Sequence, residues 1–154
     1  MGMSWTDTDS ELMRAAISEA NKAQAKNEVP VGAIVVLSGE VIGRGFNRTI
    51  QDCDPSAHAE VVAIRMAAEQ SKNHRLSGAT IYVTLEPCAM CVGAMIQARV
   101  QRLVFGAYDP KAGAVGSVMD LSESKELNHR IEVNGGLLDE ECSLILKEFF
   151  TTKR

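Results

Sequence analysis

The sequence is poor in aromatic residues and has neither an excess of basic residues nor a long hydrophobic run. Only 5% of its 154 residues are aromatic, so Val, Ile, Leu, Ala and Met must fill any core. Its 16 basic residues are outnumbered by 20 acidic ones, which argues against an extended basic groove for nucleic acid but not against a small local patch. No apolar run approaches the length of a membrane span, and residues 1–9 are too polar and acidic for a signal peptide. These absences predict no membrane partner and a cytoplasmic location.

The remaining composition suits one folded unit. Hydrophobic residues make up 45% of the chain, which is enough to bury a substantial core. No internal repeat, linker or low-complexity tract divides it, so residues 1–154 are predicted to form a single domain. Two of the four cysteines, Cys53 and Cys142, are expected to be ordinary packing or surface thiols. The other two belong to a metal-type motif, which agrees with a reducing compartment.

Helical and extended patterns alternate along the chain. Thr8-Asp9-Ser10-Glu11 reads as a capping box that opens a first helix, and Asp139 is expected to cap the last one. Strand patterns cover residues 31–37, 40–45, 79–84, 102–107 and 130–133, and Asn134-Gly135-Gly136 is expected to break the last of them. A helix between strands 79–84 and 102–107 predicts that these two strands are parallel. The pattern is that of an α/β protein.

The most informative stretch is Pro87-Cys88-Ala89-Met90-Cys91, which follows a β-branched run and precedes a helical one. Pro87 suits the opening position of the helix, which would put Cys88 and Cys91 on one face of its first turn. The helix dipole there favours thiolate over thiol. Two adjacent thiolates repel each other, so the arrangement calls for a cation, and the spacing is typical of zinc ligands.

A histidine and a carboxylate lie upstream, in Asp54-Pro55-Ser56-Ala57-His58-Ala59-Glu60, which reads as another helix start with Asp54 as its cap. His58, Cys88 and Cys91 would give zinc three ligands and leave the fourth tetrahedral position open, as in catalytic sites. Glu60 would lie near the metal without being required as a ligand. A carboxylate there can carry a proton from water to a leaving group.

Each of these patterns has an ordinary explanation when it is taken alone. A Cys-x-x-Cys pair after a strand can be a redox pair, and a single helical histidine is more often a packing or surface residue. Their joint occurrence is far rarer than either part. His-x-Glu followed by Pro-Cys-x-x-Cys is the known signature of zinc-dependent deaminases, and we therefore predict a catalytic zinc site.

The whole chain, from its first helix to Phe150, resembles the bacterial TadA-type tRNA adenosine deaminases. Beyond the zinc motif, the resemblance rests on five segments: residues 29–33, 45–48, 85–88, 105–111 and 128–130. The zinc motif fits any cytidine-deaminase-like enzyme, whereas these other segments indicate the tRNA branch. The resemblance implies a three-layer α/β/α cytidine-deaminase-like fold with a five-stranded mixed sheet, and a homodimer.

The resemblance also implies a reaction and its residues. The reaction is hydrolytic deamination of the wobble adenosine (position 34) of an arginine tRNA to inosine, on the anticodon stem-loop and with one Zn²⁺ per subunit. By resemblance, His58, Cys88 and Cys91 bind the zinc and Glu60 shuttles protons. Asn47 would read the base, Asp109 would contact the ribose, and Pro30 and Ala59 would line the base pocket. Tyr108 stands where many relatives carry a basic residue, which bears on the phosphate contacts.

Two other functions fit parts of the sequence. A small-molecule nucleobase deaminase of guanine or cytosine type would share the zinc motif and suit the acidic charge. A non-catalytic zinc-binding module would not need Glu60, because a structural zinc site closes with a fourth protein ligand. If tRNA is the substrate, basic residues are expected to converge around the mouth of the site. The candidates are Arg44, Arg48, Lys111, Lys153 and Arg154.

Overall fold

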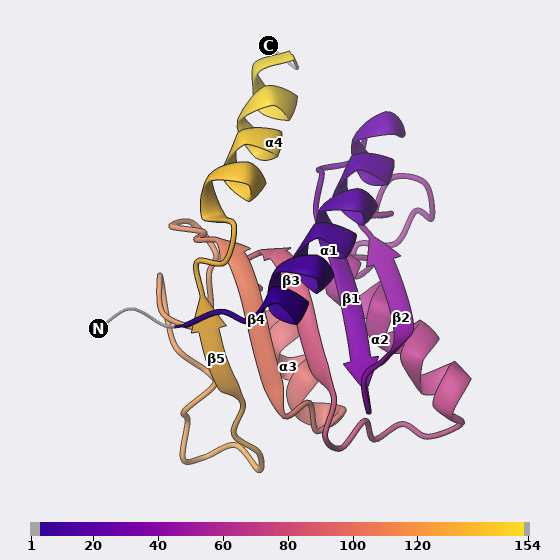
Figure 1. Cartoon of the computed structure of the whole chain (residues 1–154), viewed down its shortest axis with the longest axis vertical. Coiled ribbons are helices and arrows are strands. Elements are labelled where there is room, and N and C mark those ends of the chain that lie inside the picture. The colour runs from indigo at the N-terminus through magenta and orange to yellow at the C-terminus, as the bar shows by residue number, and fades with distance from the viewer. Residues whose placement is uncertain (1–3, 153–154) are drawn as a thin grey trace.

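A five-stranded mixed sheet lies between two layers of helices in the computed structural model, which describes residues 4–152 (Figure 1). The strands are β1 (Gly32–Leu37), β2 (Glu40–Phe46), β3 (Thr80–Leu85), β4 (Arg102–Ala107) and β5 (Glu132–Gly135), in the sheet order β2-β1-β3-β4-β5. β1 is antiparallel to both of its neighbours, whereas β3, β4 and β5 are parallel. The predicted fold class and the parallel pairing of β3 with β4 are both confirmed.

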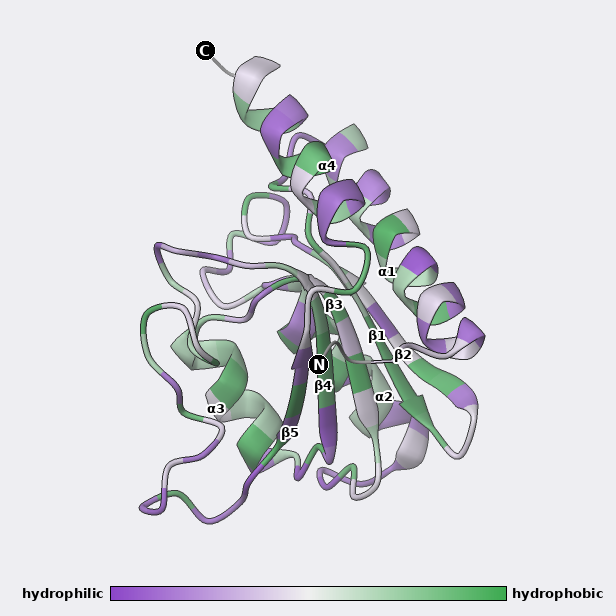
Figure 2. Cartoon of the chain, turned by 60° about the vertical axis from the view of Figure 1, so that its left-hand side comes forward, coloured by the Kyte–Doolittle hydropathy of each residue, from purple (hydrophilic) through white to green (hydrophobic). Residues whose placement is uncertain are grey.

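Two helices cover each face of the sheet. α1 (Asp7–Ala25) and α4 (Asp139–Thr152) lie on one side, and α2 (Ala59–Ser71) and α3 (Ala89–Gln97) on the other (Figures 1 and 2). Alternate residues of each strand face opposite layers. In β1, for example, Ala33 and Val35 belong to the core under α2 and α3, whereas Ile34 and Val36 belong to the core under α1. Within residues 4–152, no helix combines the length and apolarity that a membrane crossing requires.

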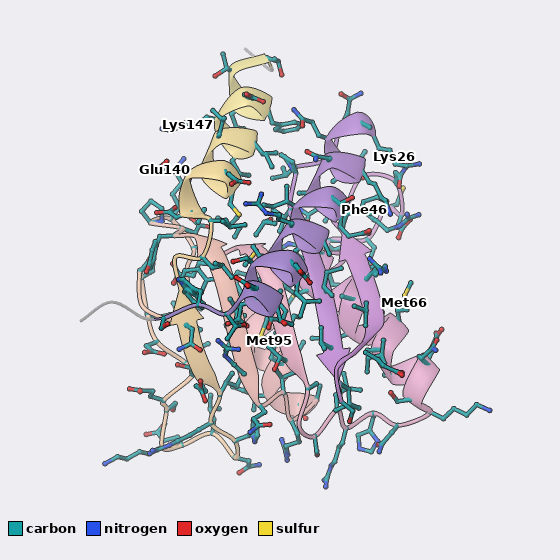
Figure 3. The ribbon with its side chains drawn as sticks, viewed as in Figure 1. Lys26, Phe46, Met66, Met95, Glu140 and Lys147 are labelled. Carbon is teal, nitrogen blue, oxygen red and sulfur yellow. The ribbon has the colours of Figure 1, made fainter. Side chains whose placement is uncertain are left out.

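The two cores are built mainly from aliphatic side chains, as the low aromatic content predicts. Met95 of α3, fully buried, fills the layer behind the sheet, whereas Glu140 and Lys147 extend from α4 on the outside (Figure 3). Cys142 is buried against the sheet and Cys53 is exposed, so each has one of the two ordinary roles expected for it.

The strand directions gather four segments at one edge of the sheet. β2, β3 and β4 end at this edge, and β1, which runs in the opposite direction, begins there. The residues that lead into β1 therefore meet those that follow β2, β3 and β4. The carboxyl ends of strands in open α/β sheets are a common place for ligands.

α2 packs unusually close to β2 because both carry small residues at the contact. A Cβ atom built on Gly45 would lie 2.4 Å from the Ala59 carbonyl oxygen, and one on Gly43 would lie 2.3 Å from that of Ala63. Only glycine permits this approach. The position of the first turn of α2 is thus determined by the backbone of β2.

Several predicted helix boundaries were wrong by a few residues. The capping box of α1 is formed by Thr6 and Asp9, not by Thr8 and Glu11. α2 begins at Ala59 with His58 as its N-cap. Asp54 lies four residues before His58, and its carboxylate accepts hydrogen bonds from the Ser56 N–H and hydroxyl groups instead of capping the helix. α3 begins at Ala89, so Cys88 is its N-cap, Pro87 precedes the helix, and only Cys91 lies in the first turn.

The last strand and helix also differ from the prediction. β5 continues through Asn134 and Gly135, because these residues pair with Val104 and Phe105 of β4 and the Asn134 side chain accepts a hydrogen bond from Arg102. Tertiary pairing thus overrides the turn propensity of Asn-Gly. Asp139 is the first residue of α4 and not its cap.

Candidate active site

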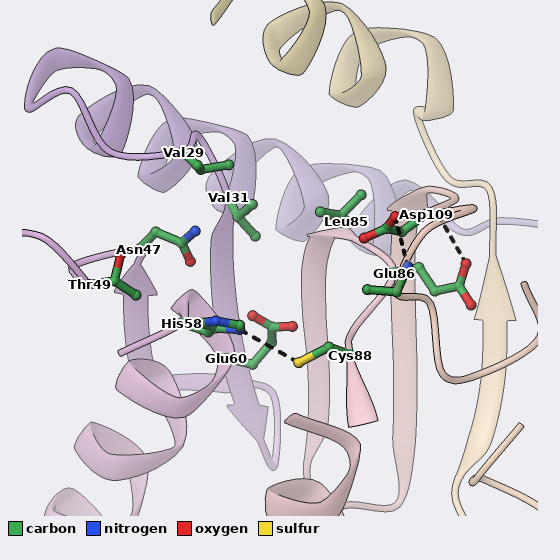
Figure 4. Close-up of a pocket in the computed structure, with 11 residues that line it drawn as sticks. Val29, Val31, Asn47, Thr49, His58, Glu60, Leu85, Glu86, Cys88 and Asp109 are labelled. Carbon is green, nitrogen blue, oxygen red and sulfur yellow. Dashed lines mark hydrogen bonds between the residues drawn. The ribbon is translucent and has the colours of Figure 1, made fainter. Parts of the chain in front are cut away.

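A cavity of about 270 Å³ opens at the edge where β2, β3 and β4 end (Figure 4). Apolar side chains supply part of its lining, and polar groups converge on it from several segments. The apolar residues are Val29, Val31, Leu85 and Ala112; the polar ones are Asn47, Thr49, His58, Glu60, Glu86, Cys88 and Asp109. The strand order therefore unites residues that lie as much as 83 positions apart in the chain, from Val29 to Ala112.

His58, Cys88 and Cys91 form the one group of potential metal ligands found among the described residues, with ligand atoms within 4.8 Å of one another. The Nδ1 atom of His58 lies 3.6 Å from the Sγ atom of Cys88 and 3.5 Å from that of Cys91. Zinc bonds of about 2.0–2.1 Å to nitrogen and about 2.3 Å to sulfur, at a tetrahedral angle, separate the two atoms by about 3.5–3.6 Å. The three side chains thus fit a tetrahedral zinc ion.

The two cysteines also need a positive charge between them. The pKa of Cys88 is lowered to about 3, chiefly because Cys91 and then His58 form hydrogen bonds with its thiolate. That same hydrogen bond, together with burial, raises the pKa of Cys91. Ionisation of Cys88 therefore disfavours ionisation of Cys91. A metal ion removes this competition, and both sulfurs can then be thiolates.

Glu60 lies beside this group in the first turn of α2 and is 4% exposed. Burial raises the pKa of its carboxyl group to about 7, against the opposing effect of a hydrogen bond from its own backbone N–H and the charge of His58. A carboxyl group with a pKa near neutrality can both accept and release a proton. The arrangement offers a metal position, an acid–base group and an enclosed volume for a substrate.

Comparison with known proteins agrees with this geometry. Residues 7–154 match the family of MafB19-like deaminases. A tRNA-specific adenosine deaminase from Haemophilus influenzae is 47% identical over 150 residues, which cover 97% of this chain and 87% of that protein. A solved structure from studies of A-to-I editing by tRNA:A34 deaminases superposes with a TM-score of 0.87 at 46% identity, covering 89% of this chain and 99% of that one.

The chain belongs to the tRNA-specific adenosine deaminases. A guanine deaminase from Nitrosomonas europaea also shares the architecture, with a TM-score of 0.78 at 24% identity, over 98% of this chain and 87% of that one. At this level of identity the likeness concerns the fold alone.

In this deaminase, the orientation of the Asn47 side chain is determined by Ala59. The Ala59 N–H donates to Asn47 Oδ1 at 2.8 Å. Because an N–H group needs an acceptor, the amide oxygen of Asn47 must face α2, and its NH₂ group faces the cavity (Figure 4). Ala59 is fully buried and is not a lining residue. It acts on the cavity through Asn47.

Asp109 and Pro30 lie on other walls of the deaminase cavity. Asp109 Oδ1 accepts hydrogen bonds from the backbone N–H groups of Lys111 and Ala112, whereas Oδ2 accepts none from the residues that the structure describes. One oxygen of Asp109 thus shapes its own turn while the other is free to meet a ligand. Pro30 is buried between Val29 and Val31, two residues that do line the cavity.

Two carboxylates were missed by the sequence reasoning. Glu86 lines the cavity, is 2% exposed, and accepts hydrogen bonds from the loop after β4. Burial by itself raises the pKa of Glu86, but hydrogen bonds from Ser117, Asp109 and Val115 outweigh it and lower the pKa. Glu28 is fully buried and accepts from the loop after β2. The one sequence signal that could have identified Glu86 was its charge directly after the apolar run of β3.

The expected basic residues are placed differently from one another. Arg48 pairs with Asp52 through two hydrogen bonds of 3.0 and 3.1 Å, and its guanidinium group lies 5.4 Å from the ring centre of Phe46. Lys111 is exposed in the same turn as Asp109. Arg44 is exposed on β2. Lys153 and Arg154 lie outside the described residues.

Proposed function

We propose that this deaminase converts the wobble adenosine, position 34, of an arginine tRNA to inosine, with one zinc ion per chain. The observation that carries the proposal is that a buried carboxyl group and an outward-facing amide line the same cavity as His58 and Cys88, two of the three matched metal ligands. The relatives described as tRNA-specific adenosine deaminases and tRNA:A34 deaminases support the choice of substrate. An anticodon loop suits the enclosed site because its bases are single-stranded and leave the stack at low cost.

His58, Cys88 and Cys91 would hold the zinc ion, which supplies activation of a water molecule at neutral pH. Glu60 takes a proton from the attacking water and gives it to a ring nitrogen; it then takes the proton of the hydroxyl group now bonded to the base and gives it to the departing ammonia. The NH₂ group of Asn47 donates to an acceptor on the base, such as a purine ring nitrogen.

The remaining residues would surround the nucleotide. Asp109 Oδ2 accepts a hydrogen bond from the ribose, as its half-buried position allows. Pro30 and Ala59 shape the base pocket through the backbone on either side of them. Arg48 and Lys111 contact phosphates. We further propose that the enzyme is a single-domain homodimer that acts in the cytoplasm, which light scattering and cell fractionation can test.

The deciding experiment compares substrates. We expect inosine to form in an anticodon stem-loop with adenosine at the wobble position, and no reaction with a guanosine wobble base, free guanine or cytidine. Deamination of guanine or cytidine without reaction on the stem-loop would make the protein a small-molecule deaminase instead.

Substitution of Glu60 separates its role from that of the ligands. Glu60→Ala should lower kcat by about 10²–10⁴-fold, the usual contribution of a general acid–base group, while the zinc content stays at one per chain. Glu19 is also 4% exposed but lies on α1, so Glu19→Ala is the matched control and should keep its activity. Loss of zinc from Glu60→Ala would identify the carboxylate as a ligand and contradict the proposed mechanism.

Zinc content tests the ligand set directly. His58→Ala, Cys88→Ala and Cys91→Ala should each lose zinc, measured by mass spectrometry of the purified protein. Cys142 is a comparably buried cysteine that belongs to the core on the other face of the sheet, so Cys142→Ala should keep its zinc. Retention of zinc by the His58 or Cys91 variant would contradict the assignment.

A further inference from the structure

Glu86 is a buried carboxylate without a cationic partner. It follows β3 directly, precedes Pro87 and Cys88, and is 2% exposed. None of the ion pairs in residues 4–152 includes it. A buried charge costs several kcal/mol unless hydrogen bonds compensate it. Packing alone therefore does not explain why a charged side chain is buried at this position.

The compensation comes from one loop. Glu86 Oε1 accepts from the Asp109 N–H at 3.1 Å, and Oε2 accepts from the Val115 and Ser117 N–H groups at 3.2 and 3.1 Å. The Ser117 hydroxyl donates to Oε1 as well. These four bonds cross 23 to 31 positions of sequence. They bind the first part of the loop after β4, residues 109–117, at both of its ends.

The neighbouring backbone strengthens the same attachment. The carbonyl group of Pro87 accepts a hydrogen bond from the Ala114 N–H at 2.9 Å. A Cβ atom on Gly113 would lie 2.3 Å from the carboxyl carbon of Glu86, so the loop lies directly on the carboxylate. Glu86 and Pro87 together hold residues 109–117 against the segment that carries Cys88.

The held loop forms one wall of the cavity. Asp109 and Ala112 line it, and Glu86 and Cys88 line it from the adjacent segment (Figure 4). The Asp109 backbone is held by Glu86 and its Oδ1 by the turn it caps. The direction of Oδ2 is therefore set by Glu86 and the turn, not by solvent.

The opposite wall is built in the same way by a different residue. Glu28, fully buried, accepts from the Ile50 N–H at 3.1 Å and the Gln51 N–H at 2.8 Å. This fastens the loop after β2, which carries Asn47. Each of the two loops that face the substrate cavity is thus fastened by its own buried carboxylate.

We propose that Glu86 is a positioning residue for the deamination reaction: its carboxylate holds the 109–117 loop so that Asp109 meets the nucleotide at a fixed distance from the metal ligands. This inference rests on the proposed function. Glu86 itself need not touch the substrate. Its replacement by the isosteric amide would place an NH₂ group against N–H donors and release the loop.

The test measures Glu86→Gln on the anticodon stem-loop. Zinc content should remain one per chain. KM should rise by about tenfold to a hundredfold, which is the range expected for loss of a hydrogen bond to a charged group. Amide hydrogen exchange should become faster at Asp109, Val115 and Ser117. Ser117→Ala removes one of the four bonds from an exposed position and should show a smaller rise. A variant that was merely less folded would lose active enzyme at unchanged KM.

A double-mutant cycle tests whether Glu86 acts through Asp109. Asp109→Ala and Glu86→Gln should be strongly non-additive because both act through the same wall, whereas Asp109→Ala and Glu28→Gln should be close to additive. If the wild type is active and Glu86→Gln and Ser117→Ala have unchanged KM, or if Glu86→Gln loses zinc, the positioning role is wrong while the proposed function stands. If the wild type does not deaminate the stem-loop, both are wrong.

Discussion

The first turn of α1 is fastened to the sheet by the buried carboxylate of Asp9. Its Oδ1 accepts hydrogen bonds from Tyr82 Oη at 2.7 Å and from Arg102 Nη1 at 3.1 Å, and its Oδ2 accepts one from the Thr6 N–H at 3.2 Å. Arg102 Nε donates in turn to Asn134 Oδ1. The network therefore connects the start of α1 to β3, β4 and β5.

The network makes the stability of the fold depend on pH. Burial by itself raises the pKa of Asp9, but hydrogen bonds from Tyr82, Thr6 and Arg102 outweigh it and lower the pKa from 3.8 to about 2. One pKa unit corresponds to about 1.4 kcal/mol, so ionised Asp9 stabilises the fold by about 2 kcal/mol. Because the folded pKa lies below the unfolded one, this contribution is fully present above pH 3.8 and is lost as the pH falls toward 2.

Asp9→Asn should therefore lower the free energy of unfolding at neutral pH by about 2 kcal/mol, or Tm by about 4–8 °C for a chain of this size. The gap between variant and wild type should close as the pH falls from about 4 to about 2, because wild-type Asp9 becomes protonated as well. Urea unfolding followed by circular dichroism at several pH values measures it. Asp7→Asn, at an exposed position in the same turn, controls for the helix dipole.

Two results would refute this reasoning. Equal stability of Asp9→Asn and wild type at neutral pH would mean that the network contributes nothing net. A gap that stays constant across the acidic range would assign the loss to geometry and not to ionisation.

Three further predictions concern the site. Gly45→Ala should lower the deamination rate at least tenfold, because its Cβ would lie 2.4 Å from a backbone oxygen and would push away the first turn of α2. Gly93→Ala, which places its Cβ in open space, should leave the rate unchanged. Equal rates for the two variants would contradict the argument. Asn47→Asp keeps the acceptor for α2 but loses the NH₂ donors, so the fold should persist while KM for the stem-loop rises, and an unchanged KM would remove Asn47 from base recognition. Neutral substitutions at Arg48 and Lys111 should weaken stem-loop binding and flatten its dependence on salt, and unchanged affinity across a salt series would place the RNA elsewhere.

The fold class and the candidate metal ligands could be predicted because their signals are local. The apolar run of β3, the helix after it and the strand at Arg102–Ala107 specify a parallel pair through chain connectivity alone. Cysteine and histidine are the usual zinc ligands, and here they stand at the spacing of a known motif. His58, Cys88 and Cys91 could therefore be named as candidates before their geometry was known. Their meeting within 4.8 Å agrees with that reading.

Helix starts were less predictable because several residues in a row can act as caps. Thr6 and Thr8 both precede acidic residues, and Asp54 and His58 both precede the apolar series of α2. The choice depends on which N–H groups remain without a partner once the turn before the helix has folded. Asp54 was already engaged by Ser56, so His58 became the N-cap of α2.

The two carboxylates that hold the cavity walls were visible only in the folded chain. The side chains of Glu28 and Glu86 accept mainly from backbone N–H groups 22 to 31 positions away, and every residue except proline carries such a group. The amino-acid types therefore carry no mark of the pairing. The antiparallel pairing of β1 with β2 brings Glu28 to its donors, and the parallel pairing of β3 with β4 brings Glu86 to its own at the same edge. There the cost of burying a charge decides which loop conformation persists.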